Sequence, residues 1–104
     1  MNKASLCMLV VCCKDYKPSH NWYYQKSGGY FYGAAKSPDS ILYDEAILKE
    51  YDSSEDFVLM PECPAMSDEE AAAEIKIWCD KNGIPYIDDM ENIEKAYAGY
   101  YRLF

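Results

Sequence analysis

The sequence predicts a small α/β or α+β fold in which helices pack on a mixed sheet of about five strands. Three observations predict it: an apolar run, LCMLVVCC, near the start; an aromatic pattern around SGG; and short apolar runs that alternate with capped helical segments in the second half. Half of the 104 residues are hydrophobic, which is enough for one core. Residues 1–104 are therefore expected to form a single domain.

The first expected element is a strand over residues 5–13. Its two adjacent valines are β-branched, and a Lys-Asp pair ends the apolar run. A run without polar interruption is typical of a strand covered on both faces. Successive side chains of a strand alternate, so one of the neighbouring thiols Cys12 and Cys13 would point away from the core.

An aromatic β-hairpin is expected next, with strands over 22–26 and 30–34 around a Ser-Gly turn. In this register, residues on one face should pack on the core, and tyrosines on the other face should be exposed. The core face would hold Trp22, Tyr24 and Phe31, and the exposed face Tyr23, Tyr30 and Tyr32.

The third segment should be a helix from Ser37-Pro38 to about Tyr51, since serine is a good cap and proline suits the first helical position. A short strand over 57–60 should follow. The SDEE motif is a capping box that predicts a helix over 68–82, which ends at Asn82-Gly83.

A strand over 84–87 and a last helix complete the expected order. Asp88 and Glu91 have the spacing of a second capping box, and apolar residues recur at helical spacing beyond them. Strand, helix, strand, helix predicts a C-terminal βαβα unit in which strands 57–60 and 84–87 are parallel.

Parallel strands would bring several reactive side chains to one edge of the sheet, where ligands bind in open α/β sheets. A thiol enzyme or phosphocarrier would use Cys12, Cys13 or Cys63 there. Cys63 precedes a helix, whose dipole favours a thiolate, but the carboxylates around it favour a protonated thiol. The expected cluster is Cys12, Cys13, Asp15, Glu62, Cys63, Asp88 and Asp89.

The stretch from DFVLMP to KNGIPYID resembles the second half of the B component of the lactose/cellobiose-type sugar phosphotransferase system. The resemblance covers about 40 residues and implies a phosphorylated cysteine at the end of the first strand, where Cys12 or Cys13 lies. That family follows its cysteine with a small Gly/Ser-rich loop that holds the phosphate. Here the loop is KDYKPSHNW, which departs from that pattern, so the family's activity is not carried over.

The five cysteines lack the spacing of a disulfide framework or a zinc site, and free thiols are the default expectation. His20, in a polar loop, is expected to be a solvated surface residue. No metal or cofactor is expected. The initial apolar run is too short to span a bilayer and does not have the features of a secretory signal, which favours a cytoplasmic protein.

The charge is divided unequally, with +4 on residues 1–36 and −12 on residues 37–104. An acidic protein repels nucleic acid and anionic membranes, so neither is an expected partner, although rings and lysines interleave near the start of the chain.

The favoured function is non-enzymatic binding to a basic protein surface; a homo-oligomer is also compatible with the sequence. The specific form of this binding function is an inhibitor that mimics nucleic acid, as phage-encoded antagonists of restriction or CRISPR nucleases do. This is an analogy from charge and size. The enzyme or phosphocarrier is the alternative. The expected contact residues are tyrosines and acids: Tyr23, Tyr30, Tyr32, Glu45, Glu50, Asp52, Glu62, Glu69 and Glu70.

Overall fold

The structure, a computed structural model, describes residues 3–15 and 20–103, with the backbone alone at 101–103. Its strands are β1 (Ala4–Ser5), β2 (His20–Gln25), β3 (Tyr30–Ala35), β4 (Phe57–Leu59) and β5 (Tyr86–Ile87). Its helices are α1 (Leu6–Lys14), α2 (Glu45–Ser53), α3 (Asp68–Asn82), the 3₁₀ turn η1 (Met90–Asn92) and α4 (Ile93–Leu103). The mixed α/β class predicted from the sequence is confirmed.

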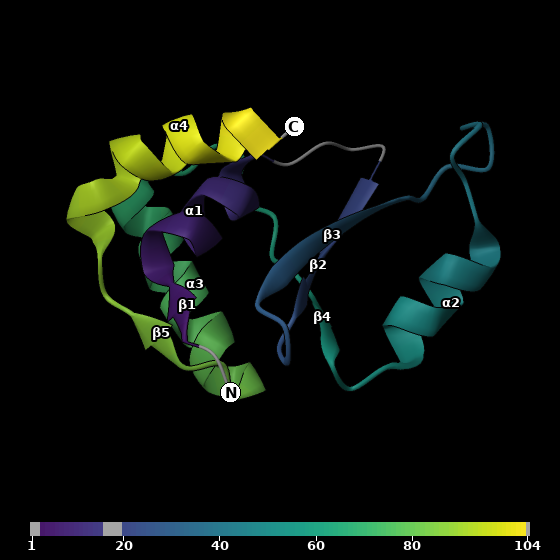
Figure 1. Ribbon diagram of the computed structural model, residues 1–104, viewed down its shortest axis with the longest axis horizontal. Coiled ribbons are helices and arrows are strands. Elements are labelled where there is room, and N and C mark those ends of the chain that lie inside the picture. Colours follow the sequence, from purple (N-terminus) through teal and green to yellow (C-terminus); the bar gives the residue numbers. More distant parts are fainter. Residues whose placement is uncertain (1–2, 16–19, 104) are drawn as a thin grey trace.

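The described strands form two sheets, and the expected single sheet is wrong. β1 and β5 make a parallel pair, while β3, β2 and β4 form an antiparallel sheet in that order. β4 and β5 therefore do not pair, and the expected parallel βαβ unit is absent from the described chain. Figure 1 shows the three-stranded sheet between a group of helices, α1, α3 and α4, and the separate helix α2.

The largest correction concerns the apolar run, which forms helix α1 rather than a strand. Seven of its nine residues are buried. α3 and α4 pack against it, and Figure 1 shows α1, α3 and α4 together on one side of the three-stranded sheet. In a continuous apolar run of this length, the spacing of apolar residues cannot distinguish a fully buried strand from a fully buried helix. Burial on every side explains why α1 has no polar face.

The segment after the hairpin also differs from its prediction, because it forms turns before α2 begins. The Ser37 and Ser40 hydroxyls accept backbone N–H groups two residues ahead, at Asp39 and Leu42. Such local bonds compete with a helix. Asp44 is the actual cap, and its carboxylate accepts the N–H groups of residues 46 and 47.

α3 matches its prediction. The Ser67 hydroxyl accepts the Glu70 N–H at 3.2 Å, and Gly83 ends the helix in the left-handed region with φ of 67°. The Trp78 indole donates to the Leu59 carbonyl at 3.0 Å and so ties α3 to β4. The principal extents are 38 × 25 × 23 Å.

Candidate functional site

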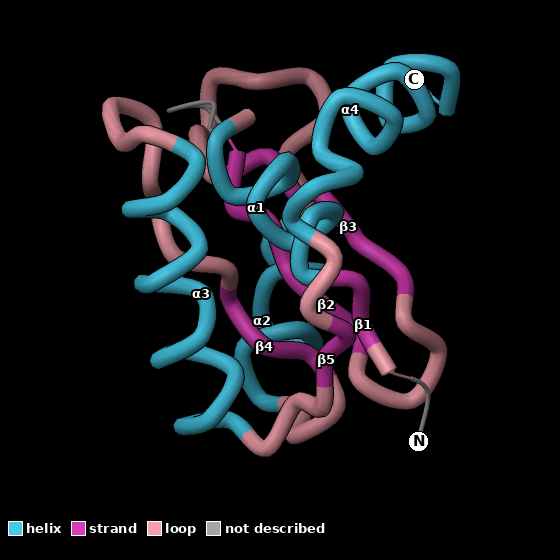
Figure 2. The backbone as a smooth tube through the Cα atoms, turned by 90° about the vertical axis from the view of Figure 1, so that its left-hand side faces the viewer, coloured by secondary structure: helices cyan, strands magenta, loops and turns pink. Residues whose placement is uncertain are grey.

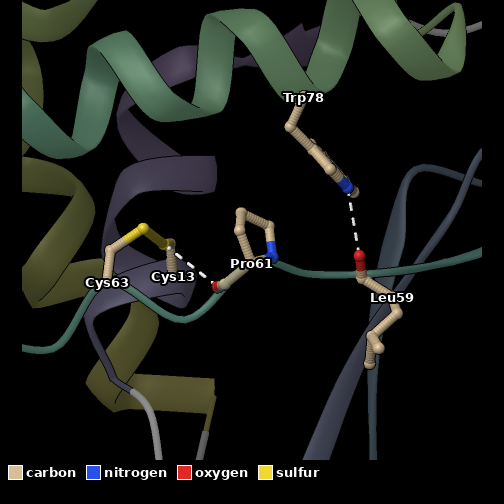
Figure 3. The surroundings of a disulfide bond; sticks show 5 residues. All are labelled: Cys13, Leu59, Pro61, Cys63 and Trp78. Carbon is tan, nitrogen blue, oxygen red and sulfur yellow. Dashed lines mark hydrogen bonds between the residues drawn. A yellow bond between two sulfur atoms is a disulfide. The ribbon is translucent and has the colours of Figure 1, made fainter.

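The predicted cluster of thiols and acids does not form. Cys13, near the end of α1, makes a disulfide with Cys63 in the loop before α3, with a Cα–Cα distance of 5.6 Å (Figure 3). Both residues are buried. The expectation of free thiols is therefore wrong for this pair, and neither sulfur is a nucleophile while the bond is intact. The Cys13 sulfur also lies 3.2 Å from the Pro61 carbonyl oxygen.

Cys12 stays a free thiol but is enclosed. Burial raises its pKa, and the negative charge of Asp15 adds to the rise, so the unreactive protonated form is favoured. The cavity that Cys12, Cys13 and Glu62 line has a volume of only about 10 Å³, which does not hold a substrate. Cys12 therefore has neither the exposure nor the lowered pKa that is typical of a nucleophilic thiol.

The expected acids of the sheet edge lie apart from one another. Asp15 accepts a hydrogen bond from the Tyr100 hydroxyl at 2.7 Å. Asp88 is exposed and forms an ion pair with Lys76 at 3.5 Å. Asp89 lies at the opposite end of α1 from the disulfide, because it contacts the backbone of Cys7.

Asp89 caps α1 from more than 80 residues away in the sequence. Its carboxylate accepts the Cys7 N–H at 3.0 Å and the Ser5 hydroxyl in a short hydrogen bond, and the Cys7 thiol lies 3.3 Å away. Burial alone would raise the pKa of Asp89, but these hydrogen bonds together hold it below its ordinary value. The pKa of the Cys7 thiol is raised, first by burial and also by the Asp89 charge. The arrangement is a helix cap rather than an activated nucleophile.

The hairpin has the predicted register but not the predicted exposure. Tyr23 pairs with Tyr32 and Tyr24 with Phe31, so the two faces are assigned correctly. The expected exposed face is nevertheless closed in part: Tyr23 is 1% exposed and Tyr32 is half-buried, whereas Tyr30 is 65% exposed. The expectation that Tyr23 is available to a partner is wrong.

The reason is that α2 covers this face through aromatic contacts that sequence reasoning missed. The ring centroids of Tyr51 and Phe57 are 4.5 Å apart, and the Tyr51 ring lies 5.1 Å from that of Tyr23. The Tyr23 hydroxyl also donates to Asp52 at 2.7 Å. Tyr51 and Phe57 lie directly on either side of the DSSED turn. This pair of aromatic residues was the sequence signal that could have indicated the contact.

The six predicted acidic contact residues are all exposed but fall on two separate surfaces. One surface, called the α2 surface below, carries Glu45, Glu50 and Asp52. The other, at the start of α3, carries Glu62, Glu69 and Glu70. Figure 1 shows α2 and α3 on opposite sides of the three-stranded sheet, so the acids do not form one continuous patch.

Large exposed apolar side chains lie on α2 and on the segment that leads into it. Ile41 is 99% exposed and Leu42 is 71% exposed, and Ile47 on α2 is exposed as well. Leu42 and Ile47 line a groove of about 140 Å³ between α2 and the hairpin. No residue of α2 is buried, so this helix contributes little to the core and leaves most of its surface accessible.

Two further findings concern the described residues. They contain no group of three or more His, Cys, Asp or Glu side chains placed to hold a metal ion, and His20 is partly exposed at the start of β2. None of their helices has the length and apolar character needed to cross a membrane.

Comparison with protein-family models, curated proteins and solved structures found no match.

Proposed function

We propose that this chain is a non-enzymatic protein that binds a basic, partly apolar surface of another protein through the α2 surface. The observation that carries the proposal is the exposure of Ile41 and Leu42, 99% and 71%, in the acidic segment that leads into α2. Exposed apolar side chains that form a patch with a polar rim are typical of protein-binding sites. The cost of leaving both side chains in water is offset when a partner covers them.

Charge defines the kind of partner. Residues 37–56 contain seven acids and one lysine, a net charge of −6, and the lysine already pairs with Glu45 at 3.2 Å. A basic partner would be attracted over distances of about one Debye length, roughly 8 Å at physiological salt. The apolar residues would then provide affinity after the charges have guided the encounter.

The specific form of this proposal is an inhibitor that mimics nucleic acid and occupies the groove of a nuclease or another defence protein. A groove built for phosphates would attract the acids of the α2 surface. The acids at the start of α3 would form a second contact only with a partner large enough to touch both acidic surfaces at once. Competing DNA or RNA should displace the chain from such a partner.

A cytoplasmic location remains part of the proposal, and the disulfide counts against it. Disulfides persist in oxidising compartments and are rare where glutathione and thioredoxin reduce them. Counting the free thiols of the protein immediately after lysis in an alkylating agent tests the location.

The test compares charge-neutral variants on the two surfaces. The pair Glu45→Gln and Glu50→Gln should weaken binding, by up to about 30-fold if each charge contributes about 1 kcal/mol. The matched control, Glu74→Gln with Asp80→Asn, removes the same charge from exposed positions of α3 outside the expected contact residues. Ile41→Ser with Leu42→Ser tests the apolar part.

A partner captured from a host lysate with the wild-type chain is purified, and its affinity for each variant is measured between 0.05 and about 1 M salt, where the Debye length falls to about 3 Å. The proposal predicts loss with both α2 variants and retention with the control. Equal loss with all three variants, or an affinity that salt does not change, would contradict it.

A further inference from the structure

A second site lies away from the α2 surface, in a pocket of about 470 Å³ where β1, α1, the hairpin turn and α4 meet. Both Figure 1 and Figure 2 show the turn between β2 and β3 near β1. Its volume is within the range of small-molecule sites. The lining residues that matter here are Lys3, Met8, Tyr24, Tyr30, Phe31 and Tyr100.

The pocket walls are aromatic. The rings of Tyr24 and Phe31 lie 5.2 Å apart and are tilted by 54°, so they form a corner rather than a flat stack. Met8 adds a polarisable thioether, and the exposed Tyr30 ring lines the pocket from the hairpin. Planar aromatic ligands gain both apolar burial and ring contacts in such a place.

The hairpin turn is shaped to hold Tyr30 there. A Cβ atom at Gly28 would come within 2.9 Å of the Tyr30 ring, closer than real side-chain contacts allow. Glycine therefore permits the ring to lie against the turn. The same Cβ would lie 2.6 Å from the Gln25 Oε1 atom, so replacement of Gly28 by alanine would displace the Gln25 amide and the Tyr30 ring without deleting any aromatic group.

Two polar groups in the lining have bonding capacity to spare. The Tyr24 hydroxyl makes no hydrogen bond with another described residue, and it is not one of the fully enclosed polar atoms of the fold. It therefore keeps contact with solvent at the pocket, where a polar group of a ligand can bond to it in place of water. The exposed Lys3 forms no ion pair with any described residue, and its ammonium group is available to an anion.

We propose that this pocket binds a planar aromatic small molecule that carries one acidic group. The rings enclose the aromatic part, and Lys3 pairs with the acid. α2 contributes no residue to the pocket, so the site can be occupied whether or not the α2 surface binds a partner.

The test uses two matched fluorescent probes on the full chain. 1-Anilinonaphthalene-8-sulfonate carries an aromatic system with one acid, and N-phenyl-1-naphthylamine is the same framework without the acid. Titration should give one saturable site for each probe. Backbone amide NMR shifts of residues 3–8 and 24–31 should move in the same titration.

The variants separate the two parts of the site. Tyr30→Ala, at an exposed position, should weaken both probes by about 3- to 10-fold. Lys3→Met should weaken only the sulfonate probe, by about 2- to 5-fold at low salt, as expected for an exposed charge pair. Lys49→Met, on α2, is the charge-matched control and should leave the affinity for both probes unchanged. Gly28→Ala should weaken both probes while circular dichroism stays unchanged.

Several outcomes would overturn the proposal. These are absence of saturable binding, shifts in other residues, or equal effects of Lys3→Met and Lys49→Met. Equal losses of both probes on Lys3→Met would also overturn the requirement for an acid. Probe binding that survives Tyr30→Ala and Gly28→Ala would show non-specific adsorption only.

Discussion

Reduction of the Cys13–Cys63 disulfide should lower the stability of the fold by about 4 kcal/mol. The bond closes a loop with a sequence separation of 50 residues. In the chain-entropy model, a loop of this length removes about 14 cal/mol/K from the unfolded ensemble, which corresponds to about 4 kcal/mol at 25 °C. For a chain of this size, the midpoint of thermal unfolding should fall by about 15 to 30 °C.

The assay is urea unfolding followed by tryptophan fluorescence, with and without reductant. The reduced wild-type chain isolates the effect of the crosslink, since its Cys13 thiol can donate to the Pro61 carbonyl. The midpoint should fall by between about 1 and 4 M urea. The variant Cys13→Ala with Cys63→Ala should be at least as unstable as the reduced chain and should not respond to reductant.

Cys79→Ala is the matched control. Cys79 is a buried free thiol, and burial raises its pKa to about 11. Its loss should cost the same in oxidised and reduced chains. Titration of the unfolded oxidised chain should find three of the five thiols, at Cys7, Cys12 and Cys79. Five titrated thiols, or a stability change below about 1 kcal/mol on reduction, would refute the reasoning.

Three other predictions test the fold directly. Asp89→Ala should cost about 1 to 2 kcal/mol because it removes the cap of α1, whereas Asp88→Ala, at the neighbouring exposed position, should cost less than about 1 kcal/mol in urea unfolding. Because the folded-state pKa of Asp89 is lowered, this residue contributes fully to stability above its unfolded pKa of about 4, and the contribution is lost as the pH falls through the folded value. Asp89→Ala should therefore make stability depend less on pH in the acid range. An unchanged pH dependence in that range would contradict this. Trp78→Phe should cost at least about 1 kcal/mol, since the hydrogen bond to β4 and part of the ring that packs near Tyr24 are both lost, and an unchanged stability would contradict this tie between α3 and β4. Tyr23→Phe should destabilise the fold by about 1 kcal/mol through loss of the bond to Asp52, and an effect on partner binding with no effect on stability would contradict its buried position.

Elements with local signals could be predicted from the sequence. The capping box at Ser67 and the left-handed Gly83 fix both ends of α3 without reference to the rest of the chain. The hairpin register follows from its turn and from the aromatic pattern. These signals act within a few residues, so the tertiary structure did not override them.

Elements that depend on distant partners could not be predicted. Whether LCMLVVCC is a helix depends on a cap from Asp89 and on cover from α3 and α4. The disulfide depends on the loop before α3 reaching the end of α1, which no cysteine spacing reveals. The same holds for the candidate site: exposure of the acids was predictable, but closure of the tyrosine face by α2 required knowledge of where Tyr51 lies.

The central position of α1 has a consequence for biosynthesis. α1 is the first helix of this chain to be made, yet α3 and α4, which cover it, lie more than 50 residues later, and β1 pairs with β5 across 82 residues. At about 5 to 20 residues per second, the ribosome needs several seconds to make those later segments. During that time the most apolar stretch of the chain lacks its native contacts with α3 and α4, so it is the segment that a chaperone would bind on the nascent chain.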